Sequence, residues 1–371
     1  MKKKQSDSFD LEEYLKKGVE KTVLSIAKAS VFHPSQAAFA AGFALAAKKA
    51  GNKRKALAAE GKHVPPFLIC SITSACNLHC AGCYARNLSV CSDAAAKDDL
   101  DAAGWDRVFT EAEELGVSFI LLAGGEPMLR RDVIEKTAEH KGILFAVFTN
   151  GTAVKDDDVA FFAAHRNVIP VISLEGDREF TDARRGAGVY DAVDALAGRL
   201  RARGIAFAAS VTVTTKNLRE VTSQEFAASL GERGYRGAIF VEYVPTDDPA
   251  SPLAPGDAER ALLDERIREL RAQNESMIFI SFPGDEKSSG GCLAAGRGFF
   301  HINPRGGAEP CPFSPYSDVS VKDHSLAEVL ESKLFVSLRD GGYLAEEHRG
   351  GCVLFAKRGE VQALLDNKEE D

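Results

Sequence analysis

The sequence lacks any apolar run that is long enough to cross a membrane. A transmembrane helix needs roughly 20 consecutive apolar residues, and the longest candidate run, AAFAAGFALAA at residues 37–47, is much shorter. The basic N-terminus, MKKKQSDSFDLEE, also lacks the apolar core and the small-residue cleavage site of a secretory signal. We therefore expect a cytoplasmic protein.

Extremes of composition are missing as well. Of the 371 residues, 45% are hydrophobic and 27% are charged, as in ordinary soluble proteins, which excludes global disorder and a fibrous structure. A chain of this length can bury a large core, either as one barrel-sized domain with an appendage or as two ordinary domains. Eight cysteines in a cytosolic chain favour metal or redox chemistry over a disulfide framework.

Positive charge is concentrated near the N-terminus. Residues 1–63 carry a net charge of +7, whereas the whole chain carries −8, so a basic arm precedes an acidic body. Helical spacing of apolar residues predicts one helix in the arm, and a second, alanine-rich helix is expected from Pro34 to the basic run at 48–55. We interpret the arm as two helices that pack on the body with a solvated cationic end. Peripheral membrane contact or a clamp for an acidic substrate are the alternatives, and nucleic acid is not expected as a partner.

From residue 64 onward, short apolar runs alternate with amphipathic helical patterns. Six such units predict a parallel sheet that is buried on both faces, with functional groups at the carboxyl ends of its strands. After one more helix and strand the alternation stops, and a segment rich in glycine and proline follows. We expect a basic helical arm at 1–63, a core barrel at 64–284 and a small cysteine-organised domain at 285–371. The expected strands are 67–73, 118–124, 143–149, 168–174, 207–214, 238–244 and 277–282, and the expected helices are near 101–115, 130–140, 155–165, 189–203, 222–233 and 256–274.

Three cysteines lie close together in the stretch ACNLHCAGCYA, residues 75–85, directly after the first expected strand. A structural zinc site normally has four protein ligands, whereas Cys76, Cys80 and Cys83 are a set of three. A cubane 4Fe-4S cluster that is held by three thiolates keeps one iron open for an exogenous ligand. The spacing therefore favours an iron–sulfur cluster over a zinc site.

The pattern CxxxCxxC followed by an aromatic residue, here Tyr84, resembles the radical S-adenosylmethionine (SAM) superfamily. The turn GGEP after the second strand, SLEG after the fourth and DARRG beyond it resemble further marks of that family. The resemblance implies an α/β fold with a partial (β/α)6 TIM-like barrel, in which a reduced cluster cleaves SAM to a 5′-deoxyadenosyl radical that takes hydrogen from a substrate. It also implies an electron donor such as ferredoxin or flavodoxin.

The same resemblance suggests residues that bind SAM. The GGEP backbone is expected to bind the methionine amino group, and Ser173 and Glu175 are expected near the ribose and the sulfonium. Arg185 could neutralise the SAM carboxylate, with a surface ion pair as the alternative. The complete expected set is Tyr84, Gly124, Gly125, Glu126, Pro127, Ser173, Glu175, Arg185 and Thr212.

Two pairs of residues further along the barrel are expected to line the adenine or the substrate. Thr212 and Thr214 belong to the fifth expected strand, and Glu242 and Tyr243 belong to the sixth. Because alternate side chains of a strand face opposite sides, packing in the barrel explains one residue of each pair equally well.

Three more cysteines follow the barrel. The spacing C-x13-G-x4-C of Cys292, Gly306 and Cys311 resembles the opening half of the SPASM or twitch extension of the superfamily, which carries auxiliary 4Fe-4S clusters. Gly306 is expected to form a hairpin turn, and Cys352 is expected to supply a third thiolate after a helix around SLAEVLESKLF. The further close-spaced cysteines of a full SPASM extension are absent, so we expect one auxiliary cluster.

The fourth ligand of that cluster is left open by the sequence. The candidates are Cys70, Cys91, His301, His348, solvent and the substrate. Cys70 lies within a strand pattern, where cysteine usually acts as a small buried hydrophobic residue.

We expect an oxidoreductase in which hydrogen abstraction from a peptide or a small molecule is followed by electron loss to the auxiliary cluster, giving dehydrogenation or a cross-link. Radical rearrangement of a substrate bound to the auxiliary cluster is an alternative, and a non-catalytic iron–sulfur sensor or scaffold is another. The intact GGEP turn and cysteine motif argue against the latter. The helical arm before Cys76 leaves no room for a cobalamin-binding domain, and it has no hairpin signal of a leader-binding winged helix.

Overall fold

The computed structural model describes residues 11–29, 34–246, 251–345 and 351–366. Its centre is a nine-stranded sheet with the strand order β7-β6-β5-β4-β3-β2-β1-β8-β9. β1 to β7 are parallel to one another, β8 is parallel to β1, and β9 is antiparallel to β8. The strands are β1 (Phe67–Ser71), β2 (Phe119–Ala123), β3 (Leu144–Thr149), β4 (Val168–Ser173), β5 (Ala208–Val213), β6 (Gly237–Glu242), β7 (Ile278–Phe282), β8 (His301–Ile302) and β9 (Ala308–Glu309).

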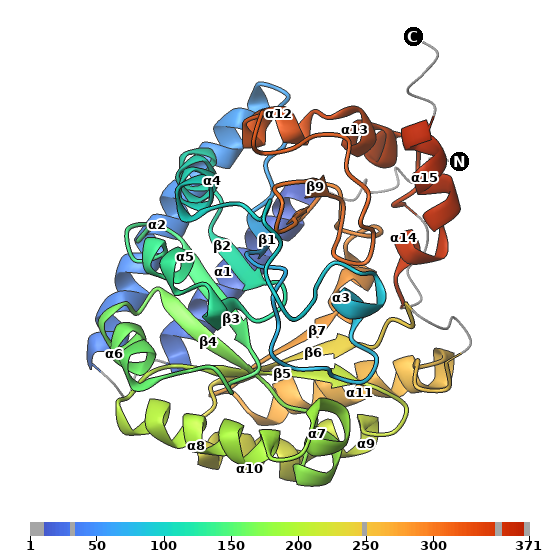
Figure 1. The fold of residues 1–371 in the computed structure, drawn as a ribbon. Coiled ribbons are helices and arrows are strands. Elements are labelled where there is room, and N and C mark those ends of the chain that lie inside the picture. Colours follow the sequence, from blue (N-terminus) through green and yellow to red (C-terminus); the bar gives the residue numbers. More distant parts are fainter. Residues whose placement is uncertain (1–10, 30–33, 247–250, 346–350, 367–371) are drawn as a thin grey trace, which may run out of the picture.

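Helices surround the curved sheet, as Figure 1 shows. In α4, Trp105 and Phe109 lie one turn apart and are fully buried against the sheet, which is the pattern of an amphipathic helix that faces a core. The alternation predicted from the sequence is confirmed, and the fold is a parallel α/β partial barrel. The helices between the strands are α4 (Ala102–Leu115), α5 (Arg131–Lys136), α6 (Asp156–Ala164), α8 (Val189–Ala202), α10 (Gln224–Arg233) and α11 (Asp257–Gln273).

Three short helices at the carboxyl ends of strands were not predicted. They are α3 (Tyr84–Asn87) after β1, α7 (Arg178–Arg185) after β4 and α9 (Leu218–Val221) after β5. α7 buries little apolar surface, and it depends instead on Asp177, whose side chain accepts a hydrogen bond from the backbone N–H of Phe180. Periodicity of apolar residues could not reveal a helix of this kind.

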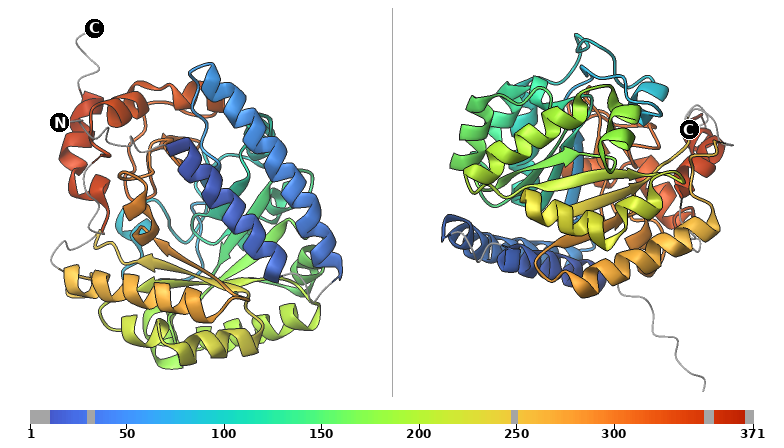
Figure 2. Two further views of the ribbon diagram at one scale, coloured as in Figure 1. Left: turned by 180° about the vertical axis from the view of Figure 1, so that it is seen from behind. Right: turned by 90° about the horizontal axis from the view of Figure 1, so that it is seen from below.

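The two predicted helices of the arm are α1 (Leu11–Ala29) and α2 (Pro34–Ala59). Figure 2 shows them across the amino-terminal end of the strands, opposite the loops that carry the first cysteines. Phe43 of α2 packs edge-on against Phe119 of β2, with 5.6 Å between ring centroids. Within the described ranges, no helix is both long enough and apolar enough to span a bilayer.

The basic run of the arm is only partly solvated, in contrast to the prediction. Arg54 is 7% exposed; its guanidinium donates to the carbonyl of Gly116 and to the Ser118 hydroxyl. Lys53 donates to the carbonyl of Glu114 at 3.1 Å. Both side chains thus bind carbonyl groups at the carboxyl end of α4, where positive charge is favourable.

The C-terminal segment extends the barrel sheet through the β8–β9 hairpin. Gly306 has a φ of +89° at the turn of this hairpin, which confirms the predicted turn. The prediction of a single helix around SLAEVLESKLF is wrong, because the structure has two. Ser332 accepts a hydrogen bond from the backbone N–H of Phe335 and caps the start of the second helix. The C-terminal helices are α12 (Leu326–Leu330), α13 (Lys333–Asp340), α14 (Val353–Ala356) and α15 (Arg358–Asp366), and short 3-10 helices occur at η1 (Pro127–Leu129) and η2 (Gly284–Ser288).

Candidate functional site

The loop that carries the first three cysteines leaves the carboxyl end of β1 and is held by its own backbone. The Cys76 N–H donates to the carbonyl of Ser92, and the Ser92 N–H donates to the carbonyl of Ser74, both at 2.8 Å. Arg86 of α3 reaches back and donates to the carbonyls of Cys76 and Leu78 at 3.1 and 3.0 Å. These bonds shape the loop through its main chain.

We call Cys76, Cys80 and Cys83 the first cysteine set. All three are partly buried, and the charges of Cys80 and Cys83 act on Cys76. Cys91 lies beside them, because its thiol donates a hydrogen bond to Cys83 that lowers the pKa of Cys83 and raises its own. The three thiols that the spacing singled out are thus near one another, and a fourth thiol, Cys91, lies beside Cys83.

Two arginines of α7 flank the first cysteine set. Glu175, just after β4, accepts hydrogen bonds at Oε1 from Arg184 at 2.7 Å and from Arg185 at 2.5 and 2.8 Å. Its Oε2 accepts from the backbone N–H of Thr212 at 3.0 Å. Arg185 also lies 4.0 Å from the Cys80 sulfur. Two guanidinium groups share one carboxylate, so one net positive charge faces the thiols.

The GGEP turn after β2 packs directly on the chain that leads into the cysteine loop. The N–H of Gly125 donates to the carbonyl of Thr73 at 2.8 Å, and the N–H of Glu126 donates to the carbonyl of Ala75 at 2.7 Å. A Cβ atom on Gly125 would lie 1.9 Å from the oxygen of Ala75. Glycine is required here because the two backbones are in contact.

The Glu126 side chain holds this turn in place. It is 1% exposed, and it accepts hydrogen bonds from the Thr149 hydroxyl and from the backbone N–H groups of Asn150 and Met128. Burial raises the pKa of Glu126. Pro127 then starts η1, so the Glu126 side chain and Pro127 together fix the shape of the turn.

The residues expected along β4 and β5 differ in their surroundings. Ser173 and Thr212 are partly buried. Thr214 is buried, and its hydroxyl donates to Asn217 at 3.0 Å. Asn217 in turn donates to the carbonyl of Glu175. Thr214 therefore supports the strand end through Asn217.

Both residues expected on the sixth strand are buried at its carboxyl end. Glu242 accepts a hydrogen bond from Arg260 of α11 at 2.7 Å. The Tyr243 ring lies over the cysteine loop, since a Cβ atom on Gly82 would be 2.7 Å from it. This side of the barrel mouth is thus closed by one ion pair and one aromatic ring.

Cys292, Cys311 and Cys352, which we call the second cysteine set, also come together. The thiol of Cys311 donates to Cys352 and lowers the pKa of Cys352, and Cys292 lies within electrostatic range of both. Cys352 caps α14 by accepting from the N–H of Phe355 at 3.4 Å. Burial raises the pKa of Cys292 and of Cys311.

One carboxylate near this set was missed by the sequence analysis. Glu286 of η2 is buried, and its side chain is hydrogen-bonded to the thiol of Cys292. Burial raises the pKa of Glu286 to about 7. Glu286 belongs to no spacing motif, so the sequence offered no signal for it.

The other candidates for a fourth ligand lie elsewhere. Cys70 is fully buried within β1, and Cys91 contacts the first cysteine set. His301 uses both ring nitrogens, because Nε2 bonds to Ser71 and Nδ1 bonds to Glu309. His348 lies outside the described residues.

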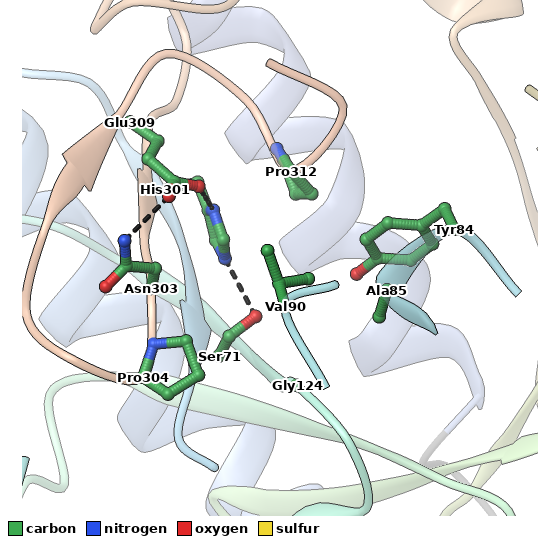
Figure 3. A pocket seen from close by; sticks show the side chains of 10 residues that line it. All are labelled: Ser71, Tyr84, Ala85, Val90, Gly124, His301, Asn303, Pro304, Glu309 and Pro312. Atoms are coloured by element: carbon green, nitrogen blue, oxygen red, sulfur yellow. Dashed lines mark hydrogen bonds and ion pairs between the residues drawn. The ribbon is translucent and has the colours of Figure 1, made fainter. Parts of the chain in front are cut away.

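A chain of polar side chains joins the β8–β9 hairpin to β1 (Figure 3). Ser71 of β1 is 2.8 Å from His301 of β8, and His301 is 2.7 Å from Glu309 of β9. Asn303 donates to the other oxygen of Glu309 at 2.7 Å. We call these four residues the polar latch. Sequence analysis did not predict it, because Ser71 and His301 are 230 positions apart.

Tyr84, the first residue of α3, is influenced by both sets. Its ring packs edge-on against Phe313 at 4.9 Å. Burial raises its pKa, as do the charges of Cys83 and Cys311. The pKa of Tyr84 is therefore affected by the charge of a thiol from each set.

The thiols fit a cluster better than a single ion. Within the described part of the chain, no three His, Cys, Asp or Glu side chains converge on a point that could hold one metal ion. In a cubane each protein ligand binds a different iron, so ligand atoms need not meet around one centre. The zinc site that was weighed against a cluster for the first cysteine set therefore has no support among the described residues.

Comparisons with known proteins agree with this geometry. Residues 70–230 match the model of the radical SAM superfamily. The chain is 30% identical to the mycofactocin maturase MftC of Mycolicibacterium smegmatis over 79% of each protein. It is 27% identical to the AdoMet-dependent heme synthase of Methanosarcina barkeri, over 78% of this chain and 88% of that protein, and 25% identical to the PqqA peptide cyclase of Rhizobium meliloti, over 78% and 82%.

A solved structure shares the fold. SuiB of Streptococcus suis, determined with its precursor peptide SuiA, superposes with a TM-score of 0.66 at 20% identity, over 84% of this chain and 76% of that one.

Proposed function

Because this chain belongs to the radical SAM superfamily, we propose that its first cysteine set binds the 4Fe-4S cluster at which SAM is cleaved. When bound, the cluster and SAM supply a 5′-deoxyadenosyl radical that removes hydrogen from the substrate. The observation that carries the proposal is that three thiols in one loop at the carboxyl end of β1 lie near enough for the charges of Cys80 and Cys83 to act on Cys76. Active sites of parallel barrels lie at this end.

Arg185 and Glu175 orient SAM on this cluster. The shared carboxylate leaves one positive charge beside the Cys80 sulfur, and this charge receives the carboxylate of SAM. Glu175 keeps both arginines in place, because its second oxygen is tied to the backbone of Thr212. Ser173 and Thr212, partly buried at the strand ends, line the ribose and the adenine.

The GGEP turn receives the amino group of SAM through its backbone. The N–H groups of Gly125 and Glu126 are already bonded to the chain before the cysteine loop. The turn therefore offers carbonyl oxygens, which are the acceptors that an amino group requires. Tyr84 closes the cluster site on the side of the second cysteine set.

The second cysteine set binds one auxiliary 4Fe-4S cluster in a twitch-like or SPASM-like domain at 285–371. Support comes from the hydrogen bond between the thiols of Cys311 and Cys352 and from the electrostatic effect of Cys292 on Cys311. A cluster held there would supply an acceptor for the electron that the substrate radical loses, and ferredoxin or flavodoxin would supply electrons to the first cluster.

The substrate we propose is a peptide, which is oxidised or cross-linked. Support comes from the relatives, because PqqA peptide cyclase is named for a peptide substrate and the MftC maturase is similar over most of its length. A second candidate is an iron porphyrin, because the AdoMet-dependent heme synthase of Methanosarcina barkeri is matched over 88% of its length.

Metal content and SAM cleavage test the enzyme class. Anaerobically reconstituted protein should hold roughly eight irons and eight sulfides and should form 5′-deoxyadenosine with a reductant. Cys80→Ala should abolish 5′-deoxyadenosine and leave about four irons. The matched control is Cys70→Ala, which removes a buried thiol outside both sets. This variant should keep the full iron content and the full rate of 5′-deoxyadenosine formation. Zinc without sulfide would refute the cluster.

The two substrate classes are separated by stimulation of SAM cleavage. Faster 5′-deoxyadenosine formation with a short peptide encoded beside the gene, and no change with an iron porphyrin, is the result expected for a peptide-modifying enzyme. The reverse result would favour the porphyrin.

The basic arm makes a peripheral contact with an anionic membrane in this proposal. Lys48 and Lys49 are exposed on α2 beside Leu45, which is 67% exposed. Basic residues next to an exposed apolar side chain suit the interface of a bilayer.

A further inference from the structure

We propose that the carboxylate of Glu286 is the fourth protein ligand of the auxiliary cluster. The other three protein ligands are the thiolates of the second cysteine set. The outer ligand of one iron is therefore a carboxylate oxygen, and the outer ligands of the other three irons are thiolates. This inference rests on the auxiliary cluster proposed above.

The position of Glu286 is the first argument. The residue is 4% exposed, and its side chain is hydrogen-bonded to the Cys292 thiol. Its charge also acts on Cys352. The carboxylate thus touches one thiol of the second cysteine set and lies close to another, inside the same buried space.

Backbone hydrogen bonds of η2 hold Glu286 in its position beside the second cysteine set. The N–H of Glu286 donates to the carbonyl of Pro283 at 2.9 Å, and the N–H of Ser289 donates to the carbonyl of Glu286 at 2.9 Å. The buried hydroxyl of Ser289 bonds to the carbonyls of Glu286 and Gly291. The turn is therefore tied into the segment that enters Cys292, so the carboxylate and the thiol keep their relative position.

Electrostatics supply the second argument. Burying a carboxylate away from water is costly unless a cation or hydrogen bonds compensate, and this carboxylate is buried among thiols that become anionic when they bind metal. Arg297 helps, because it donates to the carbonyl of Cys292 and its charge acts on Cys292 and Glu286. A cationic iron centre would offset the repulsion between the carboxylate and the thiolates, since bound metal favours the deprotonated form of every ligand.

The positions of the competing candidates supply the third argument. The thiol of Cys91 is engaged with Cys83, and both ring nitrogens of His301 are engaged in the polar latch. Cys70 is enclosed in β1. Cys70, Cys91 and His301 are thus engaged elsewhere, whereas Glu286 is hydrogen-bonded to a thiol of the second cysteine set.

The coordination has a defined chemistry. When the cluster assembles, the carboxyl group and the three thiols each release a proton, and the carboxylate oxygen binds the iron that carries no thiolate. Oxygen is a harder ligand than sulfur, so this iron differs from the other three and is the easiest to lose.

The test uses the full chain with Cys76→Ala, Cys80→Ala and Cys83→Ala, which leaves the auxiliary cluster alone. After anaerobic reconstitution this protein should hold roughly four irons, and Mössbauer spectroscopy should resolve one iron with an oxygen ligand. Adding Glu286→Gln should lower the content to about three irons and give the EPR signal of an oxidised three-iron cluster. Glu286→Cys should restore about four irons and remove the distinct one.

The matched control is Asp285→Asn, which removes the neighbouring carboxylate that pairs with Arg271 at 2.7 Å. It should keep the distinct iron. The inference is overturned when Glu286→Gln and Glu286→Cys both retain four irons and the same distinct iron as this control. A folded triple-cysteine variant that binds no iron shows instead that the proposed auxiliary cluster is wrong. Circular dichroism establishes that each variant is folded.

Discussion

At the scale of single residues, the turn at Gly125 leaves no room for a side chain. The oxygen of Ala75 occupies the place of a Cβ atom, so Gly125→Ala must push the GGEP turn away from the cysteine loop. We expect a loss of about 1 to 3 kcal/mol in stability and loss of iron from the first cysteine set. Iron analysis and thermal unfolding measure both.

Gly198→Ala is the control for this substitution. Gly198 lies within α8 with no atom within 4 Å of the added Cβ, and alanine is favoured over glycine inside a helix by about 1 kcal/mol. It should keep full iron and equal or higher stability. Equal behaviour of the two variants would contradict the role assigned to Gly125.

Single residues also mark the limit of prediction from the sequence. The first cysteine set, GGEP and Gly306 were predictable because each belongs to a short motif with fixed spacing. Glu286 and Ser71 were not, because their partners are brought to them by folding. For Arg185 the sequence left two alternatives open, the SAM carboxylate and a surface ion pair; the structure shows a buried ion pair with Glu175, a partner that no sequence signature identifies.

At the scale of elements, α2 is anchored to α4 by Arg54. Arg54→Met removes the donors to the carbonyl of Gly116 and to the hydroxyl of Ser118. Because these acceptors are buried, we expect a loss of about 1 to 3 kcal/mol in the free energy of unfolding, measured by urea titration. Lys55→Met, an exposed neighbour, should change it by less than about 0.5 kcal/mol; a similar loss there would refute the anchor.

The polar latch gives a second prediction for elements. His301→Leu leaves the Ser71 hydroxyl and one oxygen of Glu309 without their buried partner, which should cost about 3 kcal/mol. The hairpin that leads to Cys311 should loosen, so iron should be lost from the second cysteine set first. Iron analysis with EPR distinguishes the clusters. His301→Gln, which keeps a donor and an acceptor, should lose less; equal losses would argue against the latch.

Periodicity predicted the long elements well for a physical reason. Strands β1 to β7 are mostly apolar because a parallel sheet is covered on both faces. The pairing of β8 with β1 was not predictable, because two residues of strand carry no pattern of their own. The split between α12 and α13 was missed because Ser332 acts as a cap inside an unbroken amphipathic pattern.

At the scale of the whole molecule, charge is divided between a basic arm and an acidic body. If the arm contacts a membrane, each basic side chain near an anionic surface contributes about 1 kcal/mol, so binding to anionic liposomes should weaken steeply with salt. Replacing Lys48 and Lys49 by Glu should abolish sedimentation with such liposomes. The same substitutions at Lys155 and Lys216 of the body should not; binding unaffected by either pair would refute the contact.

The pairing of β1 with β8 has a consequence for the growing chain on the ribosome. β1 and the first cysteine loop emerge 230 residues before His301, an interval of roughly 10 to 50 s at ordinary rates of translation. Throughout that interval one edge of β1 has no neighbour, and unpaired edges invite association with other chains. The first cysteine loop is thus complete, beside an unpaired strand edge, well before the hairpin that will pair with that edge is made.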